Sequence, residues 1–206
     1  MNRNVLYALG GGLILVGFYL YLNSTTPAPA LAAASGNQAP TVAAAPSPEG
    51  SPPLQGMAAR LDKHLFILGP DGDVHRFDGS KLAGVKYFAF YYSASWCPPC
   101  RAFTPDLVTF YNNFKPAHAD FELIFVGQDQ SDGDMVNYMK GDSMPWPAVW
   151  FQDNDSPEVG AKRYLGPGIP DLVLVDANGN VLANSFDGNR YLGPQHVIDA
   201  IQHMVP

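Results

Sequence analysis

Two cysteines lie between a predicted strand and a predicted helix, and they are the only cysteines in the 206 residues of the chain. Residues 87–92 form an unbroken run of aromatic and apolar side chains, which predicts a buried β-strand. In residues 102–114 the apolar side chains recur at helical spacing. Cys97 and Cys100 are therefore expected at a helix N-terminus, where unpaired N–H groups and a partial positive charge stabilise a thiolate.

The run Cys97-Pro98-Pro99-Cys100 is a Cys-x-x-Cys motif, and this spacing favours thiol–disulfide chemistry. In such motifs the pKa of the first thiol falls from ~8.5 to between ~3.5 and ~7.5, so its thiolate can form near neutral pH. We therefore expect Cys97 to attack a partner disulfide and Cys100 to resolve the resulting mixed disulfide. The two prolines suit the first turn of a helix, but they lack N–H groups that would otherwise solvate the thiolate.

Two other interpretations of the cysteine pair, a zinc site and an inert structural disulfide, have less support from the sequence. A zinc site needs four ligands, but the chain has no second cysteine pair and no ligand spacing among its histidines, which are His64, His75, His118, His196 and His203. An inert structural disulfide would close so short a loop that it would remove little chain entropy. We therefore expect a redox-active disulfide, with no metal and no other cofactor.

The first 22 residues predict a membrane anchor. Residues 5–22 carry no charge and would span ~27 Å as a helix, close to the ~30 Å of a bilayer's hydrocarbon core. Arg3 is the only charge nearby and the next basic residue is Arg60, so we expect a cytoplasmic N-terminus and an exported remainder. The alternatives are a cleaved signal peptide, with small-residue sites within residues 30–34, and a buried core helix.

Residues 23–56 are rich in Ala, Pro, Ser and Gly, and Glu49 is the only charged residue among them. This composition predicts an extended tether without regular structure. Residues 57–206 are then one folded domain, long enough for a single hydrophobic core. The formal net charge of −7 and a pI of about 5.0 argue against a nucleic-acid partner and against docking on anionic lipid.

The order of the predicted elements indicates an α/β fold. Strands are predicted at residues 64–68, 74–77, 86–92, 121–127, 171–176 and 181–185. Helices are predicted from the cysteines to residue 114, with a kink at Pro105, and at residues 132–140, 157–165 and 195–204. Strand–helix–strand–helix followed by a hairpin and a helix implies a mixed central sheet flanked by helices.

Four stretches of the folded part carry a further signal: residues 91–105, residues 121–126 with Asp129, residues 144–146 and residues 168–170. Together they resemble the tryparedoxins and nucleoredoxins of the thioredoxin superfamily. The resemblance implies a thioredoxin fold, Cys97 as nucleophile, Cys100 as resolving thiol, and a cis peptide bond between Ile169 and Pro170. A cis bond would place the Ile169 backbone where it can pair with an extended partner chain, whereas the alternative is an ordinary trans-proline at a strand start.

The same resemblance raises a question about the proton of Cys100. Classical thioredoxins carry a buried acid six residues before the first cysteine, and Tyr91 occupies that position here. Asp129 is our candidate substitute, and a solvated loop carboxylate is the alternative. Asp171 follows Pro170 where relatives commonly have Thr, which is expected to place a carboxylate near the path of the partner.

Three further residues near the cysteines have two interpretations each. Arg101 either favours the Cys97 thiolate or faces water, and we expect it to face water. Trp96 and Trp146 either form an apolar rim around the cysteines or pack in the core.

We therefore expect a monomeric, membrane-tethered thiol–disulfide oxidoreductase that reduces disulfides of exported partner proteins, as thioredoxin-like proteins of cytochrome maturation do. One cysteine pair cannot relay electrons across a membrane, so an external thiol donor, expected to be a membrane protein, is required. The expected location is the bacterial inner membrane with the domain facing the periplasm, and the alternative is secretion after signal cleavage. The alternative functions are disulfide oxidation or isomerisation and, from another class, copper(I) delivery, although copper-delivering relatives generally use a Cys-x₃-Cys pair with a distant His.

Overall fold

The computed structural model describes residues 54–206. The predicted membrane anchor, residues 1–22, lies outside the described residues, as does the predicted tether except for residues 54–56. Among residues 54–206, no helix has both the length and the apolar character needed to cross a membrane.

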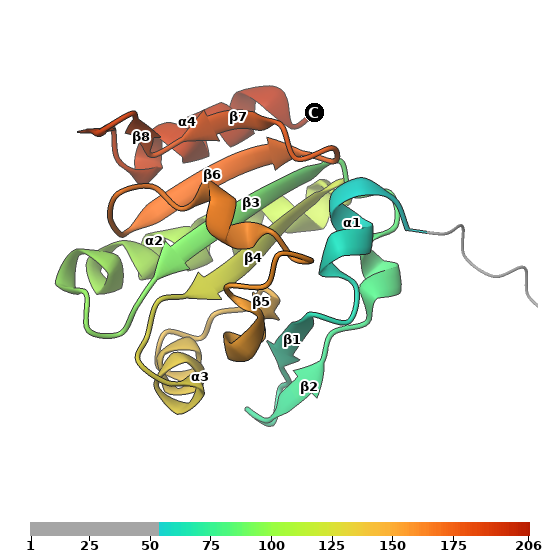
Figure 1. The fold of residues 1–206 in the computed structure, drawn as a ribbon, viewed down its shortest axis with the longest axis vertical. Helices are drawn as coiled ribbons and strands as arrows, with labels where there is room; N and C mark the ends of the chain where they lie inside the picture. The colour runs from blue at the N-terminus through green and yellow to red at the C-terminus, as the bar shows by residue number, and fades with distance from the viewer. Residues whose placement is uncertain (1–53) are drawn as a thin grey trace, which may run out of the picture. The chain divides into compact units, whose positions relative to one another are not determined.

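A seven-stranded mixed sheet runs through the domain (Figure 1). Its strands, in the order β2-β1-β5-β4-β3-β6-β7, are β1 (Leu65–Leu68), β2 (Val74–Arg76), β3 (Tyr87–Ser93), β4 (Phe121–Gly127), β5 (Ala148–Val149), β6 (Asp171–Asp176) and β7 (Val181–Asn184). β3 and β5 each pair with β4 in parallel, whereas β6 pairs with β3 and β7 in antiparallel fashion. The mixed central sheet predicted from the sequence is therefore confirmed.

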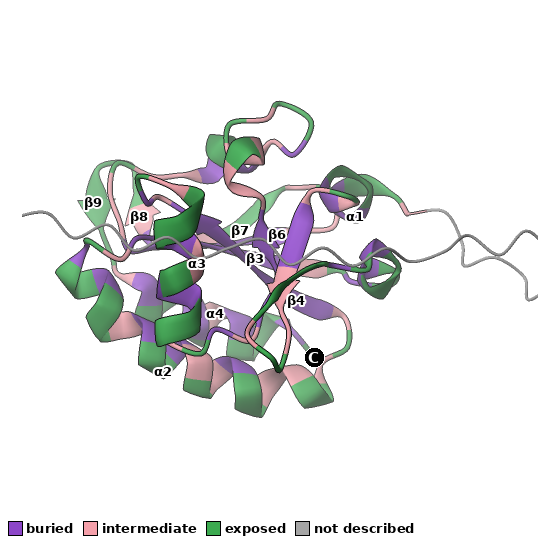
Figure 2. Ribbon diagram, turned by 90° about the horizontal axis from the view of Figure 1, so that it is seen from below, coloured by how far each residue is buried: buried purple, intermediate pink, exposed green. Residues whose placement is uncertain are grey.

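Helices cover both faces of this sheet. The α-helices of the described part are α1 (Gly56–Leu61), α2 (Pro98–Phe114), α3 (Asp132–Gly141) and α4 (Pro194–Met204). Short 3₁₀ helices add η1 (Gly79–Leu82), η2 (Lys115–Ala117), η3 (Phe151–Asp153) and η4 (Ala161–Tyr164). Figure 2 shows the exposed residues of α2 and α3 on the sides that point away from the sheet.

Two apolar clusters fill the space on either side of the sheet. Buried residues of α2, α3 and α4 pack with Ala89 and Tyr91 of β3 in one cluster. Buried residues of α1, η1 and η4 pack with Phe88 and Phe90 of the same strand in the other. Because successive side chains of a strand point to opposite faces, a strand buried on both faces reads as a continuous apolar run.

The topology brings two loops together at one edge of the sheet. Parallel strands β3 and β4 end there, where Ser93 pairs with Gly127. Antiparallel β6 begins at the same edge, where Asp171 pairs with Tyr92. The segment that follows β3 and the segment that precedes β6 therefore meet.

Three local features differ from the prediction. Residues 157–165 hold only the 3₁₀ helix η4, because Gly160 adopts a left-handed conformation with φ +67° that interrupts a helix. Helix α1 and a small hairpin of β8 (Phe186–Asp187) and β9 (Arg190–Tyr191) were not predicted. Helix α2 continues through Pro105 to its end, and the kink at this residue stays a prediction.

Candidate functional site

The two cysteines lie at the N-terminus of α2, as predicted. Cys97 is the N-cap residue of the helix, and its Sγ accepts the backbone N–H of Cys100 at 3.3 Å. The two sulfur atoms are joined in a disulfide bond. Pro98 and Pro99 occupy the first positions of the helix, where no N–H group is needed for the helical hydrogen bonds. Cys97 is 3% exposed and Cys100 is fully buried, so the first cysteine is the nearer of the two to solvent.

A cis proline lies against this pair. The peptide bond between Ile169 and Pro170 is cis, which confirms the prediction and excludes the trans alternative. The carbonyl oxygen of Ile169 is 3.8 Å from the Sγ atom of Cys97, and Ile169 packs against the small apolar cluster of Ala94, Cys97 and Cys100. The backbone that could pair with a partner chain is therefore adjacent to the first cysteine.

A groove opens beside the cysteines. It is lined by Trp96 and Gln128 on one side and by the loop of residues 165–169 on the other. Trp96 is 57% exposed, and its indole N–H donates to the carbonyl oxygen of Gln128 at 3.0 Å. Trp96 thus lines the groove, and its predicted role in an apolar rim around the cysteines stays a prediction.

Trp146 requires a correction, because it lies in the core and not at the rim. It is fully buried, and its ring packs edge-on against Tyr91 and Tyr111 at centroid distances of 6.3 Å and 5.5 Å. Residues 145–147 lead directly into β5 in the middle of the sheet, which places this indole between the sheet and α2.

Asp129 binds the loop that leads into the cysteines. Its Oδ1 atom accepts both the backbone N–H of Ser95 at 2.8 Å and the Ser95 hydroxyl at 2.7 Å. The residue is only 8% exposed, so it is not the solvated carboxylate of the alternative interpretation. These bonds hold the turn that carries Trp96 and Cys97, and the predicted role in proton transfer stays a prediction.

Arg101 is exposed, in agreement with our expectation that it faces water. Its charge acts on Asp142 at the C-terminal end of α3. Burial raises the pKa of Asp142, and the positive charge of Arg101 opposes this rise.

A buried hydroxyl network lies behind Cys100, and the sequence analysis did not find it. The hydroxyl oxygen of Thr104 is 2.8 Å from that of Tyr91 and 2.6 Å from that of Tyr138. Thr104 also donates to the carbonyl oxygen of Cys100 at 3.0 Å. Burial raises the pKa of both tyrosines, so both are neutral near pH 7. The spacing of Thr104, four residues after Cys100 in a helix, was the available signal.

Asp171 lies below the surface and not in the path of a partner chain. It is fully buried, and its Oδ2 atom accepts the backbone N–H of Gly166 at 2.7 Å. Burial raises the pKa of this carboxyl group from 3.8 to about 6, and the bond from Gly166 opposes the rise.

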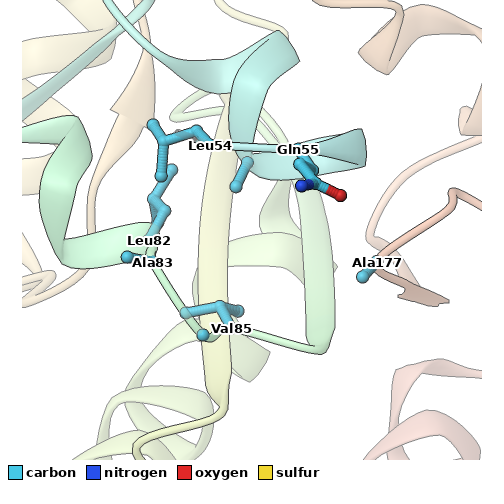
Figure 3. A pocket seen from close by; sticks show the side chains of 8 residues that line it. Leu54, Gln55, Leu82, Ala83, Val85 and Ala177 are labelled. Atoms are coloured by element: carbon cyan, nitrogen blue, oxygen red, sulfur yellow. The ribbon is translucent and has the colours of Figure 1, made fainter. Parts of the chain in front are cut away.

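A second pocket lies at the other end of the domain. It is lined by the chain around the start of α1, including Leu54, by Leu82 of η1 and the residues up to Val85 that follow it, and by Ala177 in the β6–β7 turn (Figure 3). Ala177 follows the far end of β6 from Asp171, so this pocket is separate from the cysteines. In residues 54–206 no group of three or more His, Cys, Asp or Glu side chains is arranged to hold a metal ion.

The chain is similar in sequence to a protein family and to known proteins. Residues 84–181 match the family model described as thioredoxin-like. The chain is 33% identical over 139 residues to the tryparedoxin of Trypanosoma brucei brucei, which covers 68% of this chain and 92% of that protein. It is 36% identical over 117 residues to probable nucleoredoxin 1 of Arabidopsis thaliana, covering 57% of this chain but only 19% of that protein. The chain thus spans a small part of the curated nucleoredoxins that it matches.

Solved structures of tryparedoxins and thioredoxins also resemble this chain. Tryparedoxin II of C. fasciculata superposes with a TM-score of 0.51 at 33% identity, covering 64% of this chain and 87% of that one. Thioredoxin from Wuchereria bancrofti gives a TM-score of 0.50 at 30% identity, covering 68% of this chain and 96% of that one.

Proposed function

The chain belongs to the thioredoxin-like family of thiol–disulfide oxidoreductases that includes the tryparedoxins and nucleoredoxins, and we propose that it reduces disulfide bonds of exported partner proteins. One observation carries the proposal: Cys97 is at the N-terminus of α2, beside the groove and 3.8 Å from the Ile169 carbonyl. A partner chain that pairs with the backbone of Ile169 would bring its own disulfide to this sulfur.

The first step is attack by the reduced enzyme. The Cys97 thiolate forms a bond with one sulfur of the partner disulfide, and the other partner sulfur leaves as a thiolate that takes a proton from water. The backbone N–H of Cys100 and the positive end of the helix dipole stabilise the attacking thiolate. Pro98 and Pro99 add no N–H groups, so this stabilisation comes from a single amide and the dipole.

The second step releases the partner. Cys100 loses its proton and attacks Cys97 Sγ, which frees the second partner sulfur as a thiolate. The partner is then reduced by two electrons, and the enzyme carries the Cys97–Cys100 disulfide of the structure. An external dithiol donor returns the enzyme to its reduced form by the reverse exchange.

The location of this reaction is part of the proposal. The uncharged residues 5–22 support a membrane anchor, with the domain on the exported side and a membrane protein as thiol donor. Fractionation of cells that express the full-length chain tests the anchor. The protein is expected in the membrane fraction, and a variant lacking residues 1–22 is expected to leave it.

The test of activity uses reduction of insulin by the full-length chain with dithiothreitol as donor. The wild type is expected to catalyse reduction, whereas Cys97→Ser is expected to fall to the uncatalysed rate because the nucleophile is lost. Pre-reduced Cys100→Ser, freed of dithiothreitol before insulin is added, is expected to accumulate a mixed disulfide with insulin, detected by mass spectrometry and cleaved when dithiothreitol is added back. Catalysis by Cys97→Ser would contradict the proposal.

The direction of electron flow is tested by the reduction potential of the Cys97–Cys100 pair. Equilibration of the full-length chain with dithiothreitol buffers is expected to give a value near that of thioredoxin, about −270 mV. A value near about −120 mV would instead identify an oxidant of partner proteins.

A further inference from the structure

The loop of residues 165–169 forms one wall of the groove and ends at the cis proline. Gly166 in this loop donates its N–H to Asp171 Oδ2 at 2.7 Å. A Cβ atom at Gly166 would lie 2.6 Å from the ring of Phe186 and 3.0 Å from the same carboxylate oxygen. The loop therefore sits tightly on Phe186 and Asp171, and its position depends on both.

Asp171 is an unusual support for such a loop. It is fully buried, and its second oxygen, Oδ1, has no hydrogen-bond partner. Ser185 also faces the carboxyl group, but its hydroxyl is bonded to both the N–H and the carbonyl oxygen of Leu172. An ionised carboxylate in this place costs free energy, because burial removes its water and one N–H replaces only part of it.

We propose that Asp171 is a positioning residue: its carboxylate, acting through the N–H of Gly166, holds the loop of residues 165–169 in the shape that receives the partner chain. The inference rests on the proposed function, since it concerns how the same groove binds its partner. Asp171 touches neither the cysteines nor the proposed path of the partner. Its effect is therefore on partner binding and not on the exchange between sulfur atoms.

Protonation of Asp171 weakens this support. A hydrogen bond from an N–H group to a carboxylate is stronger than one to a neutral carboxyl group. Burial raises the pKa of Asp171 to about 6, so the weakening occurs in a range in which few side chains titrate. Partner binding is therefore expected to weaken as the pH falls through this range.

Other groups near Asp171 do not explain such a change. Tyr92 on β3 and Tyr191 on β9 face it, and burial raises the pKa of both, so they stay neutral below pH 8. Arg163 of η4, which faces Tyr92, stays charged. Cys97, beside Ile169, does titrate in the reduced enzyme, and the experiment must separate its contribution.

The kinetic test measures single-turnover oxidation of the pre-reduced full-length chain by insulin between pH 5 and pH 8. The insulin concentration at half-maximal rate is expected to rise below pH 6 in the wild type. In Asp171→Asn, whose amide oxygen still accepts from Gly166 but never ionises, this concentration is expected to depend on pH only through Cys97. Asp171→Ala is expected to raise it roughly tenfold at pH 8, where Asp171 of the wild type is ionised, and by less below pH 6, with the limiting rate unchanged.

Asp176→Asn is the matched control, because Asp176 lies at the other end of the same strand. Its carboxylate accepts N–H groups of Asn178 and Asn180 in an exposed turn. This variant is expected to keep the pH dependence of the wild type. Identical pH dependence in wild type and Asp171→Asn would overturn the inference.

A second readout does not depend on activity. In the oxidised full-length chain neither cysteine titrates, so the NMR amide signal of Gly166 reports on Asp171 alone. The signal is expected to titrate near pH 6 in the wild type and to stay constant in Asp171→Asn. A constant signal in the wild type would reject the role of Asp171, whereas failure of the wild type to reduce insulin would reject the proposed function.

Discussion

At the scale of single residues, the hydrogen bonds of Asp129 favour a role in holding the loop before the cysteines over a role in proton transfer. Its Oδ1 atom accepts two hydrogen bonds from Ser95, the residue before Trp96. Asp129→Asn keeps an oxygen in the same place, so we expect insulin reduction within about twofold of wild type. Asp129→Ala removes the acceptor and frees the loop, and we expect about a tenfold lower rate.

The comparison of these two variants decides the role. A carboxylate that moves the proton of Cys100 cannot be replaced by an amide, so equal losses in Asp129→Asn and Asp129→Ala would favour proton transfer. Steady-state insulin reduction at pH 7 measures both. The melting temperature of each variant shows whether the loop change has spread to the fold.

The residues that the sequence could predict are those whose chemistry depends on spacing along the chain. Cys97 and Cys100 are defined by their separation and by the helix that follows them, and Pro170 by the short motif before a strand. Trp146 and Asp171 were predicted less well. Their surroundings come from distant segments, α2 for the indole and the loop at Gly166 for the carboxylate, so burial could not be predicted from local pattern.

At the scale of elements, one threonine joins α2 to its neighbours on both sides. Thr104 of α2 uses its hydroxyl for three contacts, with Tyr91 of β3, Tyr138 of α3 and the Cys100 carbonyl. Since Thr104 donates its single proton to the carbonyl, it accepts from the tyrosines, which have a second partner each: the Cys100 carbonyl for Tyr91 at 3.4 Å and the Ser93 hydroxyl for Tyr138 at 3.0 Å. The Thr104 hydroxyl therefore connects the cysteine helix with the central strand and with α3.

Replacing this threonine is expected to be costly. Thr104→Val keeps the shape but removes the threonine hydroxyl from both tyrosines, which keep the Cys100 carbonyl at 3.4 Å (Tyr91) and the Ser93 hydroxyl at 3.0 Å (Tyr138) as partners, so we expect a loss of about 1–2 kcal/mol in the free energy of unfolding. Tyr91→Phe removes one donor and leaves no unpaired group on Thr104, so we expect about 1 kcal/mol or less. Urea denaturation of the oxidised proteins measures both. Equal losses would mean that the network does not depend on Thr104 as its centre.

Helices and strands could be predicted from the sequence where the apolar pattern extends over enough residues. Strand β4 has the predicted bounds, residues 121–127, because a run of seven mostly apolar, aromatic and β-branched residues is the length of a strand and too short for a typical helix. Helix α1 was not predicted because its six residues are too few for a helical period and follow a stretch rich in proline. The strands of the β8–β9 hairpin have two residues each, so they depend on tertiary contacts, such as the bond from the Tyr191 hydroxyl to the Pro170 carbonyl.

At the scale of the whole molecule, the sheet topology assembles the site from segments far apart in sequence. The cysteines follow β3, and the cis proline precedes β6, about 70 residues later along the chain. They meet because β3 and β6 are antiparallel neighbours that end and begin at the same edge. The site therefore forms only when the sheet is folded. A change that destabilises the sheet also destabilises the contact between the cysteines and the cis proline.

Asp171, at the start of β6, makes that stability depend on pH. Its pKa is raised by burial from 3.8 in the unfolded chain to about 6 in the folded protein, so the folded state binds the proton more tightly. Its contribution to stability is thus fully present below pH 3.8 and is lost as the pH rises through 6. Relative to Asp171→Asn, the unfolding free energy of the wild type is expected to fall by about 2 kcal/mol between pH 4.5 and pH 7.

Urea denaturation of the oxidised full-length chain at several pH values measures this difference, and the comparison with Asp171→Asn cancels the other titrating groups. The comparison of wild type with Asp176→Asn is expected to show a pH dependence of the unfolding free energy with the opposite sign. Burial is the largest single influence on Asp176 and raises its pKa, but the hydrogen bonds from Asn180, Asn178 and Gly179 together lower the pKa below its ordinary value. Its contribution is therefore present at neutral pH and lost as the pH falls below 3.8. If wild type and Asp171→Asn differed by a constant amount across the range, Asp171 would have an ordinary pKa, and the pH dependence proposed for the groove would fail with it.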